Sequence, residues 1–231
     1  MLIALIHGQN HKGSSYHIGR ILAEKLEKED NIKEVFLPKD MPHFCCGCTN
    51  CFMKDETLCP HYNTVNPITN ILDEADVLIF TTPVYVYHAT GSMKVLLDHY
   101  GYRWMVHRPE EKMFSKQAVC ISTAAGGGMK SACKDIKDSL FYWGVGKIYC
   151  YGVAVYATSW KGISNKKRAV IENKVNKLAK KIIKNDGHVR VSMKTKVYFN
   201  IMRLMQKSGW NSVDVTYWKQ KGWDQKKRPW K

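Results

Sequence analysis

The chain has 231 residues, of which 45% are hydrophobic and 24% are charged, and its formal net charge is +16. This is the composition of a globular protein, so a collagen-like or wholly disordered chain is excluded. A chain of this length buries a sizeable core without disulfide bonds. No apolar run approaches the roughly 20 residues that a membrane-spanning helix needs, and the sequence therefore excludes an integral membrane protein.

The positive charge is concentrated in the last third of the chain. Residues 1–159 contain 16 Lys and Arg and 16 Asp and Glu, whereas residues 160–231 contain 20 basic and 4 acidic side chains. The first part has the charge balance of an ordinary soluble domain. The basic remainder indicates a separate purpose or a separate partner.

The N-terminal segment and the cysteines favour a cytoplasmic protein. Residues 1–7 turn polar too early for a secretory signal, and no basic segment precedes their apolar run. In a cytoplasmic chain, eight cysteines indicate metal ligands or redox chemistry more than a disulfide framework.

Short apolar runs alternate with helical stripes along most of the chain. The runs predict buried parallel strands at residues 1–6, 34–37, 77–80, 118–121 and 148–156. Helical spacing between and after them is kept by Ile18, Ile21, Leu22 and Leu26, by Met93, Leu96, Leu97 and Tyr100, and by Ile171, Val175, Leu178 and Ile182. The last set predicts a long basic helix at about residues 164–186. Strand alternating with helix predicts one doubly wound α/β sheet.

The pattern changes after Gly187, which divides the chain into a domain at 1–187 and a basic, Trp-rich extension at 188–231. An amphipathic helix is predicted around residues 198–205, and four of the seven tryptophans lie in the last 22 residues. Large aromatic side chains in water are unfavourable, so we expect the extension to pack on the sheet or on a second subunit. A homodimer in which residues 190–231 cover the partner is the specific prediction.

In a doubly wound sheet, ligands bind beyond the carboxyl ends of the strands. The first such loop, residues 7–16, has glycines and two serines at the start of a helix, which suits a phosphate. A nucleoside-triphosphate loop is excluded because Ser14 stands where the lysine would be, and a dinucleotide loop is excluded because the middle glycine is missing. A simple Gly/Ser helix cap without a ligand is the alternative.

Two further loops follow the third and fourth predicted strands. Residues 81–94 form a proline-stiffened turn in which Tyr85 and Tyr87 offer flat surfaces to an aromatic ligand, or else pack on the sheet edge. Residues 123–128 are small and leave room for a planar ring, or else form a plain flexible loop. A phosphate loop, an aromatic wall and a glycine-rich edge together indicate FMN.

The three loops resemble those of the flavodoxin-like NAD(P)H-dependent FMN reductases over about residues 1–156. Residues 7–16 resemble the family's phosphate loop GSPRKGSSY, with Gln9, Asn10 and His11 in place of its Ser, Pro and Arg. Residues 82–99 resemble its sPvYw…slKxflDR segment, with His99 in place of the Arg, and residues 126–128 resemble its third flavin loop. The resemblance implies a five-stranded parallel sheet of order 2-1-3-4-5, FMN as cofactor and NAD(P)H as electron donor. The residues implied to bind FMN are Gln9, His11, Gly13, Ser14, Ser15, Tyr16, Pro83, Val84, Tyr85, Val86, Tyr87, Thr123, Ala124, Ala125, Gly126 and Gly127.

Five cysteines are clustered between the second and third predicted strands. The spacing Cys45-x2-Cys48-x2-Cys51-x7-Cys59, with Cys46 spare, approximates a ferredoxin-type [4Fe–4S] run and resembles the compact motif of the iron–sulfur flavoproteins. Metal-free thiols, a labile disulfide and a zinc site stay open as alternatives. Of the other cysteines, Cys120, Cys133 and Cys150 are expected in the core.

The leading prediction is an FMN-dependent NAD(P)H oxidoreductase that passes electrons to a small molecule or a redox protein. No catalytic acid or nucleophile is assigned, because the cofactor supplies the chemistry. One alternative adds a [4Fe–4S] cluster as a relay. A second alternative, from a different class, is a flavin-free binding module whose basic tail contacts nucleic acid or an anionic membrane.

Overall fold

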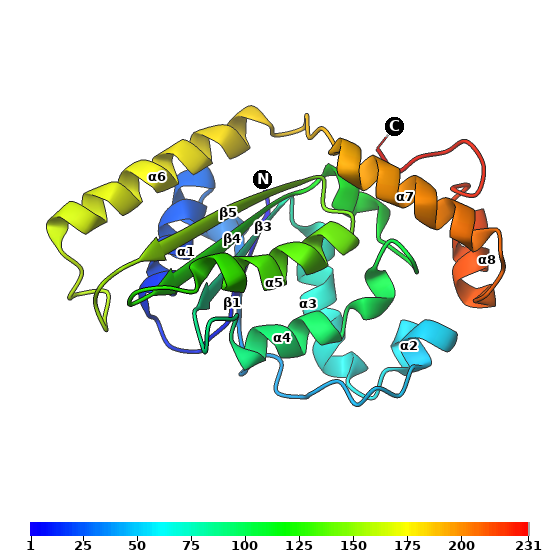
Figure 1. Ribbon diagram of the computed structural model, residues 1–231, viewed down its shortest axis with the longest axis horizontal. Helices are drawn as coiled ribbons and strands as arrows, with labels where there is room; N and C mark the ends of the chain where they lie inside the picture. Colours follow the sequence, from blue (N-terminus) through cyan, green and yellow to red (C-terminus); the bar gives the residue numbers. More distant parts are fainter. Residues whose placement is uncertain (231) are drawn as a thin grey trace.

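A computed structural model, which describes residues 1–230, contains one five-stranded parallel sheet of order β2-β1-β3-β4-β5 (Figure 1). The sheet order and the α/β architecture confirm the predicted fold. The strands are β1 (Ile3–His7), β2 (Ile32–Phe36), β3 (Val77–Pro83), β4 (Gln117–Ala124) and β5 (Lys147–Ala154).

Helices cover both faces of the sheet (Figure 1). On one face, α1 (Ser14–Leu26) and α6 (Asn165–Lys184) share a buried core with the strands. On the other face, α3 (Tyr62–Glu74), α4 (Gly91–Asp98) and α5 (Met129–Tyr142) form a second core with them. Burial on both faces explains why β1, β3 and β4 are continuous apolar runs instead of alternating ones.

The predicted element boundaries differ from the observed ones by a few residues. The second strand begins and ends earlier than predicted, at Ile32–Phe36, and the fifth ends at Ala154. The edge strand β5 is only partly covered, so Cys150 is exposed and the prediction of a core cysteine there is wrong. Both Cys120 and Cys133 are buried, as expected.

The C-terminal extension forms two helices, α7 (Met193–Gln206) and α8 (Ser212–Gln220), at one end of the molecule (Figure 1). They form a third core with residues of the domain, in which Trp218 and Trp223 are fully buried against Phe199, Phe114 and Met105. Of the two expected partners for the extension, its own chain or a second subunit, its own chain buries these two tryptophans, so the predicted cover of a partner does not involve them.

The segment between β2 and α3 has little regular structure. It contains the one-turn helix α2 (Asn50–Met53), which contacts α8, and a short 3-10 helix at Glu56–Leu58. Further 3-10 helices lie at Glu29–Asn31, Gly101–Arg103 and Glu111–Ser115. Within residues 1–230, none of the helices combines the length and the apolar character needed to cross a membrane.

Candidate functional site

The loops after β1, β3 and β4 meet at the carboxyl edge of the sheet, because these three strands are neighbours. The first loop is joined to the second by Gly8 N–H, which donates to Thr81 O at 2.7 Å, and by Thr90 Oγ1, which donates to Gly8 O at 2.6 Å. The second is joined to the third by Val84 N–H, which donates to Thr123 O at 2.8 Å. The structure thus brings the predicted FMN residues of all three loops together.

The first loop ends at the N-terminus of α1, where Gly13 is the cap residue and has no side chain to accept from the first turn. The amides of Ser14, Ser15 and Tyr16 lie in that first turn, whose N–H groups have no partner within an α-helix. Ser15 is buried, Ser14 is half-buried and His11 is exposed. An uncapped helix N-terminus of this kind fits an anion such as the FMN phosphate.

The second loop makes a tight turn in which Tyr85 and His88 exchange both backbone hydrogen bonds at 2.9 Å. Its central residues, Val86 and Tyr87, have positive φ angles of 48° and 66°, a conformation that is uncommon for a β-branched side chain. Val86 is 93% exposed and Tyr87 is 70% exposed. Strained, exposed apolar residues at the ligand edge of the sheet are typical of a functional loop.

The third loop leaves open space above the sheet. A Cβ built on Gly126 or Gly127 would meet no heavy atom within 4 Å. Gly128 differs, because its φ is 89° and a Cβ there would lie 2.6 Å from Val84 Cγ1. The second and third loops therefore approach each other at a position that only glycine fits.

One buried titratable side chain lies beneath the first loop. The ring of His7 is hydrogen-bonded through Nδ1 to Thr81 Oγ1 at 2.9 Å and through Nε2 to Glu34 Oε2 at 2.8 Å. Burial lowers the pKa of His7 below its ordinary value and outweighs the contribution of Glu34, which raises it. His7 is therefore held neutral, and its ring packs on Tyr16 with centroids 4.8 Å apart.

The cysteine segment, residues 45–59, lies on the surface, and Cys51 and Cys59 line a cavity together with residues of α3. Cys45, Cys46 and Cys48 are exposed, whereas Cys51 and Cys59 are half-buried. Burial, together with the neighbouring Cys59, Cys45 and Cys48, raises the pKa of Cys51 to about 11. Burial also raises the pKa of Cys59. Cys45, Cys48 and Cys59 thus lie near enough to Cys51 to affect its pKa, but within residues 1–230 the four sulfur atoms do not form a group that could hold a metal ion as they stand.

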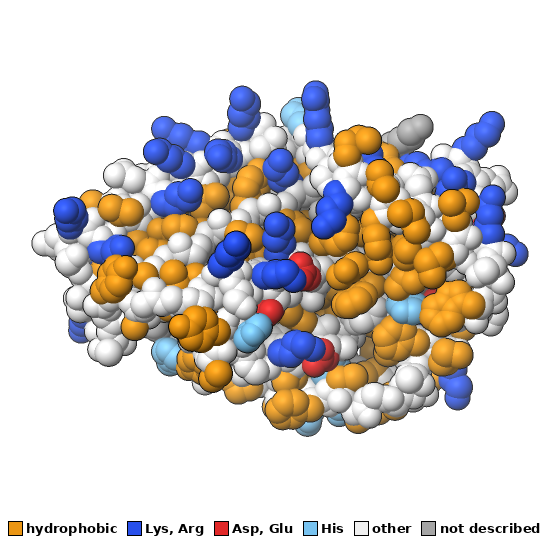
Figure 2. Space-filling view, in the orientation of Figure 1, with side chains coloured by type: hydrophobic (Ala, Val, Ile, Leu, Met, Phe, Trp, Pro, Cys, Tyr) orange, Lys and Arg blue, Asp and Glu red, His pale blue; other side chains and the backbone are white. Residues whose placement is uncertain are grey.

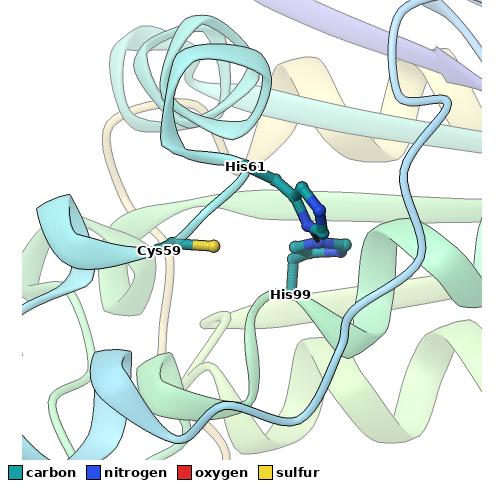
Figure 3. A group of neighbouring side chains, drawn as sticks. All are labelled: Cys59, His61 and His99. Atoms are coloured by element: carbon teal, nitrogen blue, oxygen red, sulfur yellow. Dashed lines mark hydrogen bonds between the residues drawn. The ribbon is translucent and has the colours of Figure 1, made fainter.

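Two clusters near the cysteines were missed by the sequence interpretation. Cys59, His61 and His99 place their ligand atoms within 4.8 Å of one another (Figure 3). No sequence pattern links His99 to this pair, because the helix α3 and the strand β3 lie between them in the chain.

The second cluster links α8 to the cysteine segment. Asp214 is fully buried and accepts from Arg108 Nη1 at 2.8 Å, with His107 Nδ1 at 2.7 Å on its other oxygen. The same guanidinium donates to the carbonyl oxygens of Cys51 and Phe52. Asn211 Nδ2 also donates to Phe52 O, at 3.1 Å. The extension therefore holds the backbone of the cysteine segment through a buried charge pair.

The sheet order and the loop positions define a flavodoxin-like fold, and solved reductases share it. A flavone reductase superposes with a TM-score of 0.58 at 15% identity, covering 83% of this chain and 66% of that one. An NAD(P)H:quinone oxidoreductase from Methanothermobacter marburgensis superposes with a TM-score of 0.59 at 14% identity, covering 81% and 98%. At these identities the likeness shows the fold alone.

The chain belongs to the NADPH-dependent FMN reductase family, whose model matches residues 1–159. It is thus an FMN oxidoreductase. An iron–sulfur flavoprotein of Clostridioides difficile (strain 630) is 26% identical over 189 residues, which cover 79% of this chain and 78% of that protein. Two iron–sulfur flavoproteins of Archaeoglobus fulgidus are also similar. One is 24% identical over 79% of this chain and 94% of its own length. The other is 29% identical, and the match spans 41% of its length.

Proposed function

We propose that this chain binds FMN at the three loops, is reduced by NADH or NADPH, and passes the electrons to a small-molecule or redox-protein acceptor. The observation that carries the proposal is the uncapped N-terminus of α1 at the same sheet edge as the open Gly126–Gly127 loop. Membership of an FMN reductase family supports this proposal and disfavours the alternative of a flavin-free binding module.

In this proposal the chain's residues bind and orient, and the cofactor supplies the chemistry. The N–H groups of residues 14–16 hold the phosphate. Residues 83–87 and 123–127 hold the two sides of the ring, with Tyr85, which is 46% exposed, available for stacking. Neutral His7 supports the loop from below without adding a charge. FMN held by these residues would supply the redox chemistry between NAD(P)H and an acceptor.

Flavin binding by two variants tests the proposal. Ser14→Glu places a carboxylate beside the phosphate, and we expect FMN affinity to fall by at least about tenfold because like charges repel at short range. Tyr85→Ala removes a stacking surface and should weaken binding or shift the reduction potential of the flavin. Ser208→Glu and Trp210→Ala, exposed positions outside the three loops, are the matched controls. Unchanged FMN affinity in both test variants would contradict the site.

A [4Fe–4S] cluster on Cys45, Cys48, Cys51 and Cys59 is the second candidate feature. It is favoured by the spacing of the four cysteines and by the names of the similar iron–sulfur flavoproteins. Held by these four thiolates, a cluster would supply one-electron transfer between the flavin and the acceptor. Iron and sulfide analysis of protein purified without oxygen tests it. About four of each per chain, lost in Cys51→Ser, would support the cluster.

The assembly proposed for this enzyme is a homodimer. An exposed apolar stripe follows α7 at helical spacing, and its members are Met193, Val197, Ile201 and Leu204. Figure 2 shows hydrophobic side chains gathered over the end of the molecule that α7 occupies, with Lys and Arg along α6. We also propose that residues 1–187 and 188–231 are the functional division of the chain, the second part serving as a support for the first.

A further inference from the structure

Three side chains of the types that bind metal ions converge at the junction of three elements, as Figure 3 shows. Cys59 follows the 3-10 helix Glu56–Leu58, His61 is the residue before α3, and His99 is the residue after α4. The thiol sulfur and one nitrogen of each ring lie within 4.8 Å of one another. One sulfur and two imidazole nitrogens are donors that bind zinc and related divalent transition metals.

The two imidazoles are already oriented for a shared ligand. The Nδ1 of His99 lies 2.8 Å from Val95 O, and since a carbonyl only accepts, this nitrogen carries the proton. The Nε2 of His99 is therefore left with a lone pair, which accepts a hydrogen bond from His61 Nδ1 at 3.1 Å. A bound ion would take the place of the proton between these two nitrogens. A ring nitrogen that donates to a backbone carbonyl while the other faces the ion is the usual arrangement of a metal-bound histidine.

Neighbouring residues hold the two imidazole rings in place, and a cavity lies on one side of the three side chains. His99 is only 5% exposed, and His61 is stacked on His43 with ring centroids 4.9 Å apart and planes at 10°. Cys59 and His99 also line a cavity of about 230 Å³, together with Cys51 and Glu56. A fourth ligand, water or a side chain, would approach from this cavity.

We propose that Cys59 Sγ, His61 Nδ1 and His99 Nε2 bind a mononuclear divalent metal ion, with Zn²⁺ as the best match and a fourth coordination position open to the cavity. The thiol loses its proton on binding, and both rings bind in their neutral form. The ion would join the end of the cysteine segment to α3 and α4. This site is distinct from a four-cysteine cluster, because two of its three donors are histidines and it does not use Cys45, Cys48 or Cys51.

The two uses of Cys59 exclude each other in one molecule. A chain that carries a cluster on four cysteines has no free thiolate for the mononuclear site. The donors differ, however, so substitutions separate them: His61→Ala removes a ligand of the mononuclear site only, and Cys48→Ser removes a ligand of the cluster only.

Cobalt binding to the full-length, iron-free protein under reducing conditions tests the proposal. Co²⁺ in a tetrahedral Cys–His site gives visible absorption bands and a sulfur-to-cobalt charge-transfer band. We expect these bands in the unaltered protein, and their loss or an affinity at least about tenfold weaker in His61→Ala and in Cys59→Ser. Cys48→Ser and the exposed His188→Ala, as matched controls, should bind Co²⁺ as the unaltered chain does.

Thermal unfolding gives a second readout that does not depend on enzyme activity. Zn²⁺ should raise the unfolding temperature of the unaltered protein and of Cys48→Ser, because a ligand that binds only the folded state stabilises it. It should not raise the unfolding temperature of His61→Ala. Because His61 is half-exposed, we expect this variant to fold. Equal Co²⁺ affinity in His61→Ala and the unaltered chain, or loss of the bands in Cys48→Ser alone, would overturn the assignment. FMN content should be unchanged in every variant, which separates this site from the flavin site.

Discussion

Gly128 has a φ of 89° and no room for a side chain, since a Cβ would lie 2.6 Å from Val84 Cγ1 and 3.2 Å from Tyr87 Cα. At the scale of single residues, this glycine sets the distance between the second and third loops. Its neighbour Gly127 has open space around its Cα, which makes the pair a matched comparison.

We expect Gly128→Ala to lower the free energy of unfolding by about 1–3 kcal/mol and to weaken FMN binding, because the new methyl group forces both loops apart and the backbone is strained. Gly127→Ala should leave stability within about 0.5 kcal/mol of the unaltered chain. Urea denaturation and FMN titration measure the two effects. A Gly128→Ala protein with unaltered stability would show that the loops do not depend on this contact.

His7 makes stability depend on pH. Its pKa is lowered in the folded state, chiefly by burial, so below the ordinary value of about 6.5 the unfolded chain takes up a proton that the folded chain does not. The stabilising contribution is therefore complete above pH 6.5 and is lost as the pH falls below it, by up to about 1.4 kcal/mol per pH unit. We expect His7→Gln to reduce this slope, measured by urea denaturation between pH 7.5 and 5.5. An identical slope in His7→Gln would contradict the assignment to His7.

At the scale of elements, the apolar runs were sufficient to predict the strands of the sheet. Continuous apolar runs in β1, β3 and β4 marked strands buried on both faces, and the sheet order followed from the resemblance to the FMN reductases. The ends of β2 and β5 were less predictable because edge strands bury fewer side chains. The contact of α8 with the cysteine segment depends on Asp214 and Arg108, which are 106 residues apart, and no local pattern records such a pair.

Asp214 fastens α8 to the domain. Asp214→Ala should lower the free energy of unfolding by about 3–5 kcal/mol, because it leaves the buried guanidinium of Arg108 without its counter-charge. We also expect Cys51 to react faster with a thiol reagent. Its carbonyl oxygen accepts a hydrogen bond from Arg108, and this guanidinium is no longer held in place without Asp214. Glu111→Gln, which breaks partly exposed pairs with Lys221 at 3.5 Å and Lys227 at 3.4 Å, is the control and should cost less than about 1 kcal/mol. Equal losses in the two variants would mean that the buried pair is no stronger than a surface one.

At the scale of the whole molecule, the unequal distribution of charge affects association. The exposed stripe of α7 lies among Lys194, Lys196 and Arg203, so two chains that meet there bring like charges together. Salt screens that repulsion, whereas salt weakens binding to phosphates or anionic lipids.

We therefore expect the homodimer to be more stable at high salt than at low salt in sedimentation experiments on the full chain. The double variant Val197→Ser with Ile201→Ser should be monomeric, because it removes the centre of the stripe. Val170→Ser, a 53% exposed position on α6, should sediment as the unaltered chain does. A full-length chain that is monomeric at both salt concentrations rules out the dimer.

The hydrogen bond from Asn211 to Phe52 joins residues 159 positions apart. On the ribosome, the strands and the cysteine segment emerge long before α8, since synthesis proceeds from the N-terminus. The segment is then without the contact that later fixes its backbone. Docking of α8 completes the contact. The backbone of the cysteine segment therefore reaches its final position only after α8 has docked, although the two are far apart in the sequence.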